Sequence, residues 1–150
     1  MYMFGIIIIS HGKLSEGLVD ASNMIFGPQE NMIALKLNPD DAFELLKDKI
    51  VNAHHQVNVG NGVLILTDLM SASPFNQSTL AIHGLPEADQ NKTFILTGVN
   101  LPMVIEAINQ NLMQTDLEAA IEMIKDSGKN GIEDWSIKDI LVDDDDDDDF

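Results

Sequence analysis

The order of apolar and polar residues along the chain predicts four buried β-strands. The two clearest cover residues 3–9 and 63–67, which are nearly continuous apolar runs rich in isoleucine, leucine and valine. Short apolar runs of this kind are typical of strands covered on both faces of a sheet. Weaker runs at residues 31–37 and 92–97 predict two further strands.

Between these strands, apolar residues recur at the spacing of amphipathic helices. The apolar positions of the first two predicted helices are Leu14, Leu18, Ala21 and Ile25, and then Ala42, Leu45, Leu46, Ile50 and Ala53. A third helix is predicted to begin near Ser73, because proline is well tolerated at the start of a helix and Pro74 follows. Residues 102–113 and 116–125 predict two more helices, with a break over residues 127–131.

The alternation of strands and helices predicts an α/β fold. We expect a doubly wound, mainly parallel central sheet with helices on both faces. Residues 1–142 form one predicted domain, and residues 132–142 are predicted to be an extended C-terminal strand. Residues 143–150 are expected to form a disordered polyaspartate tail, because such a run cannot bury itself and repels itself.

The net charge of the chain limits the classes of molecule that it is expected to bind. The sequence contains 25 acidic residues against 8 lysines and no arginine, a net charge of -17. Without the seven aspartates of residues 143–149 the net charge is still -10. An acidic surface repels phosphate backbones, which argues against a nucleic-acid partner, and it attracts basic proteins. The chain has no cysteine, and residues 3–9 are too short to cross a bilayer, so we expect a cytoplasmic protein.

Two candidate catalytic residues follow the two clearest strands. In a doubly wound sheet, ligands bind beyond the carboxyl ends of the strands, commonly between the first and third. His11 and Asp68 stand directly past these two strands. A carboxylate bonded to one ring nitrogen fixes the tautomer and leaves the other nitrogen as a nucleophile. Helix starts near Leu14 and Ser73 would supply amides that bind phosphate. The same residue types also serve as turn and capping residues, so spacing alone leaves both roles open.

Four motifs occur in order over about the first 125 residues. They are IIIISHG at residues 6–12 with Leu14 and EGL at 16–18 after it, GVLILTD at 62–68, SPFN at 73–76, and GVNLPM at 98–103. Together they resemble the enzyme IIA component of the mannose/fructose/sorbose class. This class belongs to the bacterial phosphoenolpyruvate-dependent sugar phosphotransferase system.

The resemblance implies a phosphoryl carrier with the doubly wound fold. It implies that His11 is phosphorylated, that Asp68 orients its ring, and that Ser73, with Gly12 and Ala72, binds the phosphoryl group. The implied donor is the histidine phosphocarrier protein HPr, and the implied acceptor is a IIB component. That component phosphorylates sugar arriving through a membrane permease. It further implies a homodimer in which a C-terminal strand is exchanged, a role for residues 132–142. No cofactor or metal is expected.

The sequence departs from the family at the loop before Ser73. Many relatives carry two glycines where this chain has Ser71 and Ala72, and glycine permits unusual dihedrals and close backbone approach. The shape of the loop, and the IIB component that it fits, are therefore open.

The remaining histidines and two rival functions give further predictions. His54 and His55, at the end of the second helix, are predicted to be ordinary surface or C-terminal helix residues and no zinc site. His83 is predicted to be an ordinary helical residue. Two rival functions remain: a histidine-type phosphohydrolase and a flavodoxin-like binding module without phosphoryl transfer. The first normally requires an arginine clamp, which this chain lacks.

Overall fold

The computed structural model describes residues 2–140 and contains a four-stranded parallel sheet. Its strands are β1 (Gly5–His11), β2 (Met32–Leu37), β3 (Val63–Thr67) and β4 (Thr93–Leu96), in the spatial order β2-β1-β3-β4. Every neighbouring pair is parallel. The predicted strands are confirmed, and the direction of winding reverses between β1 and β3, as it does in doubly wound sheets.

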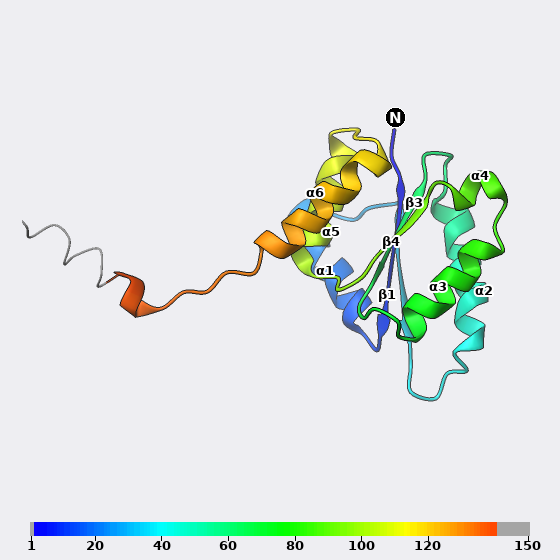
Figure 1. Ribbon diagram of the computed structural model, residues 1–150, viewed down its shortest axis with the longest axis horizontal. Helices are drawn as coiled ribbons and strands as arrows, with labels where there is room; N and C mark the ends of the chain where they lie inside the picture. Colours follow the sequence, from blue (N-terminus) through cyan, green and yellow to red (C-terminus); the bar gives the residue numbers. More distant parts are fainter. Residues whose placement is uncertain (1, 141–150) are drawn as a thin grey trace, which may run out of the picture.

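Helices cover both faces of this sheet. They are α1 (Leu14–Phe26), α2 (Glu44–Val57), α3 (Ser73–His83), α4 (Glu87–Gln90), α5 (Leu101–Leu112) and α6 (Leu117–Asn130). Figure 1 shows α1, α5 and α6 on one side of the sheet and α2 and α3 on the other. This arrangement confirms the predicted α/β fold. No helix within residues 2–140 is both long enough and apolar enough to span a bilayer.

The isoleucine run of β1 divides its side chains between two cores. Ile6 and Ile8 pack into the cluster beneath α1, α5 and α6, whereas Ile7 and Ile9 pack into the cluster beneath α2 and α3. Successive side chains of a strand point to opposite faces, so both faces of β1 must be apolar. Full burial of one such side chain stabilises the fold by about 1.5–3 kcal/mol. The cores therefore fix the register that brings the end of β1 beside the end of β3.

One predicted helix boundary is wrong. The break expected over residues 127–131 is absent, because α6 continues to Asn130. Gly128 lies in the helix where a Cβ atom would come within 2.5 Å of the Met103 side chain. The glycine therefore serves close packing between α5 and α6, and does not end the helix.

The predicted C-terminal strand does not form within a single chain. Residues 132–136 have no regular structure, residues 137–140 are helical, and none of them joins the sheet. The segment extends away from the body (Figure 1), with Ile132, Trp135, Ile137 and Ile140 exposed. A strand needs a neighbour to bond with, and this chain offers the segment none. Its exchange in a dimer stays a prediction, and residues 141–142 and the expected tail at 143–150 lie outside the described residues.

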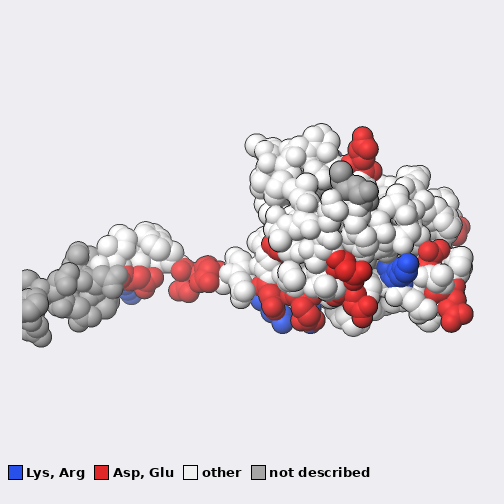
Figure 2. Space-filling view, turned by 90° about the horizontal axis from the view of Figure 1, so that it is seen from above, with Lys and Arg blue, Asp and Glu red and all other residues white. Residues whose placement is uncertain are grey.

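The surface of the described body reflects the acidic composition. On the face seen in Figure 2, acidic side chains outnumber lysines. Ion pairs among the described residues include Lys36 with Glu16 at 2.9 Å and Lys125 with Glu122 at 3.1 Å.

His54 lies in the last turn of α2, so of the two predicted placements the helix C-terminus is correct and the surface is wrong, because the residue is buried. Only 2% of the residue is exposed, and its Nε2 lies 3.0 Å from Thr93 Oγ1. The Thr93 hydroxyl donates its proton to the Asp89 carbonyl at 2.7 Å, so Nε2 must be the donor in the contact with His54. His54 Nδ1 is thus unprotonated, and it has no partner among the described residues. Burial lowers the pKa of His54 below its ordinary value of 6.5.

This burial predicts a loss of stability in mild acid. As the pH falls below 6.5, the unfolded chain binds a proton at His54 that the folded chain refuses, so the free energy of unfolding decreases. We expect His54→Gln to reduce this pH dependence, measured by urea unfolding between about pH 7.5 and about pH 5.5. The control is an exposed histidine on another helix, and His83→Gln should retain the wild-type slope. An unchanged slope in His54→Gln would contradict the assignment.

Candidate active site

The candidate site lies where the direction of winding reverses. β1 ends at His11 and Asp68 directly follows β3, so both residues stand at the carboxyl ends of adjacent parallel strands. This edge of the sheet is opposite the N-terminus (Figure 1). The structure brings the two predicted residues together at the position that the topology predicts.

A single carboxylate oxygen holds both the backbone and the ring of His11. Asp68 Oδ2 accepts from the His11 backbone N–H at 2.8 Å and lies 2.7 Å from His11 Nδ1. Asp68 Oδ1 accepts from the Leu69 N–H at 2.9 Å. Burial alone would raise the pKa of Asp68, but the hydrogen bonds from His11 and Leu69 outweigh it and hold the pKa below its ordinary 3.8.

These bonds define the tautomer of His11. An ionised carboxylate only accepts hydrogen bonds, so the ring proton is assigned to Nδ1 and the lone pair to Nε2. The His11 side chain is 48% exposed, whereas the Asp68 side chain is only 10% exposed. The His11 ring is therefore accessible from solvent, while the carboxylate that contacts it is largely shielded from water.

The start of α3 faces the same cavity as His11. Ser73 is the first residue of α3 and lines this cavity, and Ala72 before it is extended and forms the N-cap. Pro74 has no N–H, and the amides of Ser73 and Phe75 have no acceptor among the described residues. Free amides at a helix start favour an anion. The Ser73 hydroxyl and these amides are thus available for a phosphoryl group.

Gly12 and the start of α1 are less open than we expected. Gly12 lines the cavity, but its N–H donates to the Leu37 carbonyl at 2.8 Å and is not free for a phosphoryl oxygen. A Cβ atom at Gly12 would meet nothing within 4 Å, so space does not require a glycine there. The φ of +55° does favour one, because residues with a side chain rarely adopt it. In the first turn of α1, the Ser15 amide already donates to Ser10.

One wall of the site was not predicted from the sequence. The cavity has a volume of about 380 Å³ and is lined by His11, Gly12, Leu37, Asn38, Pro39, Asp41, Phe43 and Ser73. Asn38, Pro39 and Asp41 belong to the loop between β2 and α2, where we predicted no site residue. The signal was present in the topology, because β2 is the other neighbour of β1 and its carboxyl end meets the same edge.

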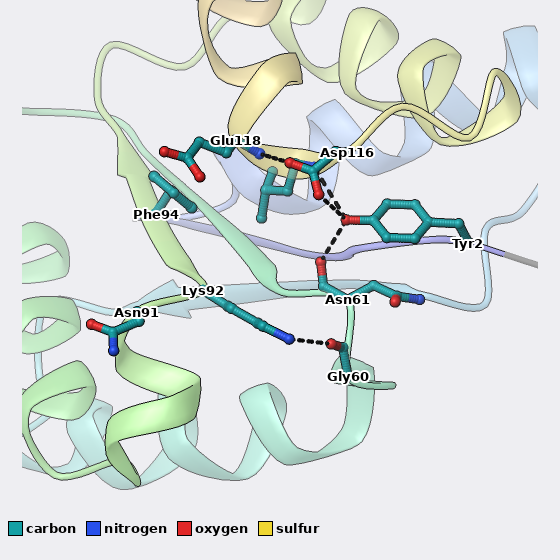
Figure 3. Close-up of a pocket in the computed structure, with 9 residues that line it drawn as sticks. Tyr2, Gly60, Asn61, Asn91, Lys92, Phe94, Asp116 and Glu118 are labelled. Carbon is teal, nitrogen blue, oxygen red and sulfur yellow. Dashed lines mark hydrogen bonds between the residues drawn. The ribbon is translucent and has the colours of Figure 1, made fainter.

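A second cavity is separate from these residues. It has a volume of about 200 Å³ and lies at the amino ends of β1, β3 and β4 (Figure 3). In it the Tyr2 hydroxyl contacts the Asn61 carbonyl at 3.2 Å and Asp116 Oδ2 at 3.0 Å. None of the predicted site residues lines it, and its hydrogen bonds fasten the start of the chain to the start of α6.

Comparison with known proteins identifies the family. Residues 5–125 match the model of the family described as PTS system fructose IIA component. The chain belongs to this family. It is a IIA component of the mannose, sorbose and fructose class, and the resemblance noted in the sequence is confirmed.

Individual relatives agree with this assignment. The sorbose-specific EIIA component of Lacticaseibacillus casei is 32% identical over 109 residues, which cover 72% of this chain and 75% of the relative. The fructose-specific EIIA component of Bacillus subtilis is 29% identical over 107 residues, or 71% and 70% of the two chains. The crystal structure of an EIIA component from Streptococcus agalactiae superposes with a TM-score of 0.74 at 27% identity, covering 88% and 97% of the chains.

The two residues that replace glycines in this IIA component differ in conformation. Ser71 has a φ of +63°, in the left-handed region that glycine occupies easily. Its carbonyl accepts from the Asn76 side chain at 3.0 Å, which holds this conformation in place. Ala72 has a φ of -85° and extended geometry, which any residue adopts. The substitution therefore strains the loop at position 71 only.

We predict opposite effects of glycine at these two positions. Ser71→Gly should raise the free energy of unfolding by about 0.5–1 kcal/mol, because relief of left-handed strain exceeds the added entropy of the unfolded chain. Ala72→Gly should lower it by about 0.5–1 kcal/mol, because only the entropic cost applies. Urea unfolding of both variants measures the difference, and a loss of stability in Ser71→Gly would refute the argument.

Proposed function

We propose that this IIA component is a phosphoryl carrier and that His11 is the residue that carries the group. The donor would be phospho-HPr and the acceptor a IIB component, both in the cytoplasm. The IIB component would then phosphorylate sugar arriving through a membrane permease. The observation that carries the proposal is the bond between His11 Nδ1 and Asp68 Oδ2, which leaves Nε2 unprotonated and accessible.

The proposed transfer requires no cofactor. The Nε2 lone pair of His11 attacks phosphorus, and an N–P bond forms as the bond between phosphorus and the donor histidine breaks. The electron pair of the broken bond returns to the donor imidazole. In the second transfer a nucleophile of the IIB component attacks phosphorus, the N–P bond to His11 breaks, and its electron pair returns to the His11 ring. Positive charge develops on the His11 ring as the N–P bond forms, and the ionised Asp68 carboxylate stabilises it.

The phosphoryl oxygens would be held by the start of α3. Ser73 supplies a hydroxyl and an N–H, and Phe75 supplies a second N–H. Because the chain has no arginine, free amides at a helix start are the main resource for this charge. The same absence counts against the rival phosphohydrolase, whose chemistry normally uses an arginine clamp.

The central test is transfer to the protein from a reconstituted relay. Incubation with phosphoenolpyruvate, enzyme I and HPr should add one acid-labile phosphoryl group to the wild type and none to His11→Ala, as read by intact-mass spectrometry. His55→Gln is the control and should be phosphorylated normally. Phosphorylation of His11→Ala would refute the assignment. Steady release of phosphate would indicate the phosphohydrolase, and no reaction at all would indicate the binding module.

The role of Asp68 can be tested separately. Asp68→Asn retains an oxygen that accepts hydrogen bonds but removes the charge, so phosphoryl transfer should slow by about 10- to 100-fold. Rapid-quench measurement of the transfer rate from phospho-HPr gives the comparison. Asp40→Asn removes a nearby exposed charge and should leave the rate unchanged. If the two variants transfer at equal rates, the carboxylate does not support the reaction.

A further inference from the structure

The hydroxyl of Ser10 connects the two sides of the loop that carries His11. Ser10 is fully buried and directly precedes His11 in β1. Its Oγ donates to the Gly12 carbonyl at 3.3 Å and accepts from the Ser15 N–H, in the first turn of α1, at 2.8 Å. One side chain therefore links the end of β1, the peptide after Gly12 and the start of α1.

The backbone around His11 is consequently held from three directions. The His11 N–H donates to Asp68 after β3, and the Gly12 N–H donates to Leu37 in β2. The Gly12 carbonyl is held by the Ser10 hydroxyl. Without that hydroxyl, the Gly12 carbonyl and the Ser15 amide have no hydrogen-bond partner among the described residues.

We propose that Ser10 is a positioning residue for phosphoryl transfer. Its hydroxyl fixes the peptide between His11 and α1, and so keeps Nδ1 on Asp68 and directs Nε2 into the cavity. The inference rests on the proposed carrier function of His11. Ser10 does not touch the phosphoryl group, and it acts only through the backbone of His11 and Gly12.

The conformation of Gly12 makes this support necessary. Glycine populates positive and negative φ about equally, so the φ of +55° at Gly12 is not enforced by the residue itself. If the Gly12–Lys13 peptide rotates, the backbone between His11 and α1 is no longer fixed, and the His11 ring loses part of the support that holds it against Asp68. A displacement of about 1 Å at a reacting atom is enough to slow a reaction by about two orders of magnitude.

The test compares two buried serines near the same helix. Ser22 in α1 is also fully buried, and its Oγ donates to the Val19 carbonyl at 2.9 Å. Ser10→Ala and Ser22→Ala each remove one buried hydroxyl from the full chain. We expect transfer from phospho-HPr to slow by about tenfold in Ser10→Ala and to stay at the wild-type rate in Ser22→Ala. Equal rates in the two variants would overturn the proposal.

A second measurement reports the ring directly. The ¹⁵N resonances of the His11 imidazole should show the Nδ1–H tautomer in the wild type, in Ser22→Ala and in Ser10→Thr, which retains the hydroxyl. In Ser10→Ala they should show a mixture of tautomers, which a loss of stability alone would not cause. A pure Nδ1–H tautomer in Ser10→Ala would overturn the proposal.

These readouts separate the two hypotheses. If the wild type accepts no phosphoryl group, the proposed function fails, while the tautomer of Ser10→Ala still decides the role of Ser10. If Ser10→Ala does not fold, Gly12→Ala provides the test. Its methyl group meets no neighbour within 4 Å, but its φ is disfavoured for alanine, so the same peptide should move and transfer should slow. A wild-type rate in Gly12→Ala would overturn the inference.

Discussion

The site depends on one carboxylate oxygen that serves two parts of the same residue. Asp68 Oδ2 bonds the backbone N–H of His11 and lies against its ring nitrogen. The backbone bond fixes the position of the His11 main chain, and the ring contact fixes the orientation of its imidazole. A carboxylate that made only the second contact would follow a mobile ring. Here the imidazole is held in a fixed orientation relative to the sheet, because Asp68 directly follows β3 and His11 ends β1.

The frame itself comes from alternating burial in β1. Ile6 and Ile8 contribute to one core and Ile7 and Ile9 to the other, so a shift by one residue would exchange the two sets of side chains. The same pairing sets Ile9 opposite Thr67, one residue before Asp68. Packing inside the sheet thus sets the relative positions of His11 and Asp68 at its edge, although the two catalytic candidates lie 57 residues apart in sequence.

Much of this arrangement could be predicted from the sequence because it follows from periodicity and topology. Uninterrupted apolar runs identified the buried strands, and their order placed His11 beside Asp68. Features set by individual tertiary contacts could not be predicted in this way. The place of His54 at the end of the second helix could be predicted, but its burial could not, because the bond to Thr93 that satisfies its donor is a tertiary contact. The left-handed Ser71 gives no local sign of its conformation, and the loop after β2 revealed its place in the site only once the strand order was known.

The close contact between α5 and α6 also governs how the C-terminal segment departs from the body. A Cβ atom on Gly128 would come within 2.5 Å of Met103, and one on Gly131 within 2.7 Å of Pro102. The last turn of α6 and the residue that follows it therefore pack directly against the start of α5, because neither glycine has a side chain. The direction in which residues 132–140, with the exposed Trp135, leave the body follows from this contact between α5 and α6. A larger residue at Gly131 would have to displace the rigid Pro102 ring, so the path of the chain into residue 132 depends on this glycine more than on Gly128, which faces the flexible Met103 side chain.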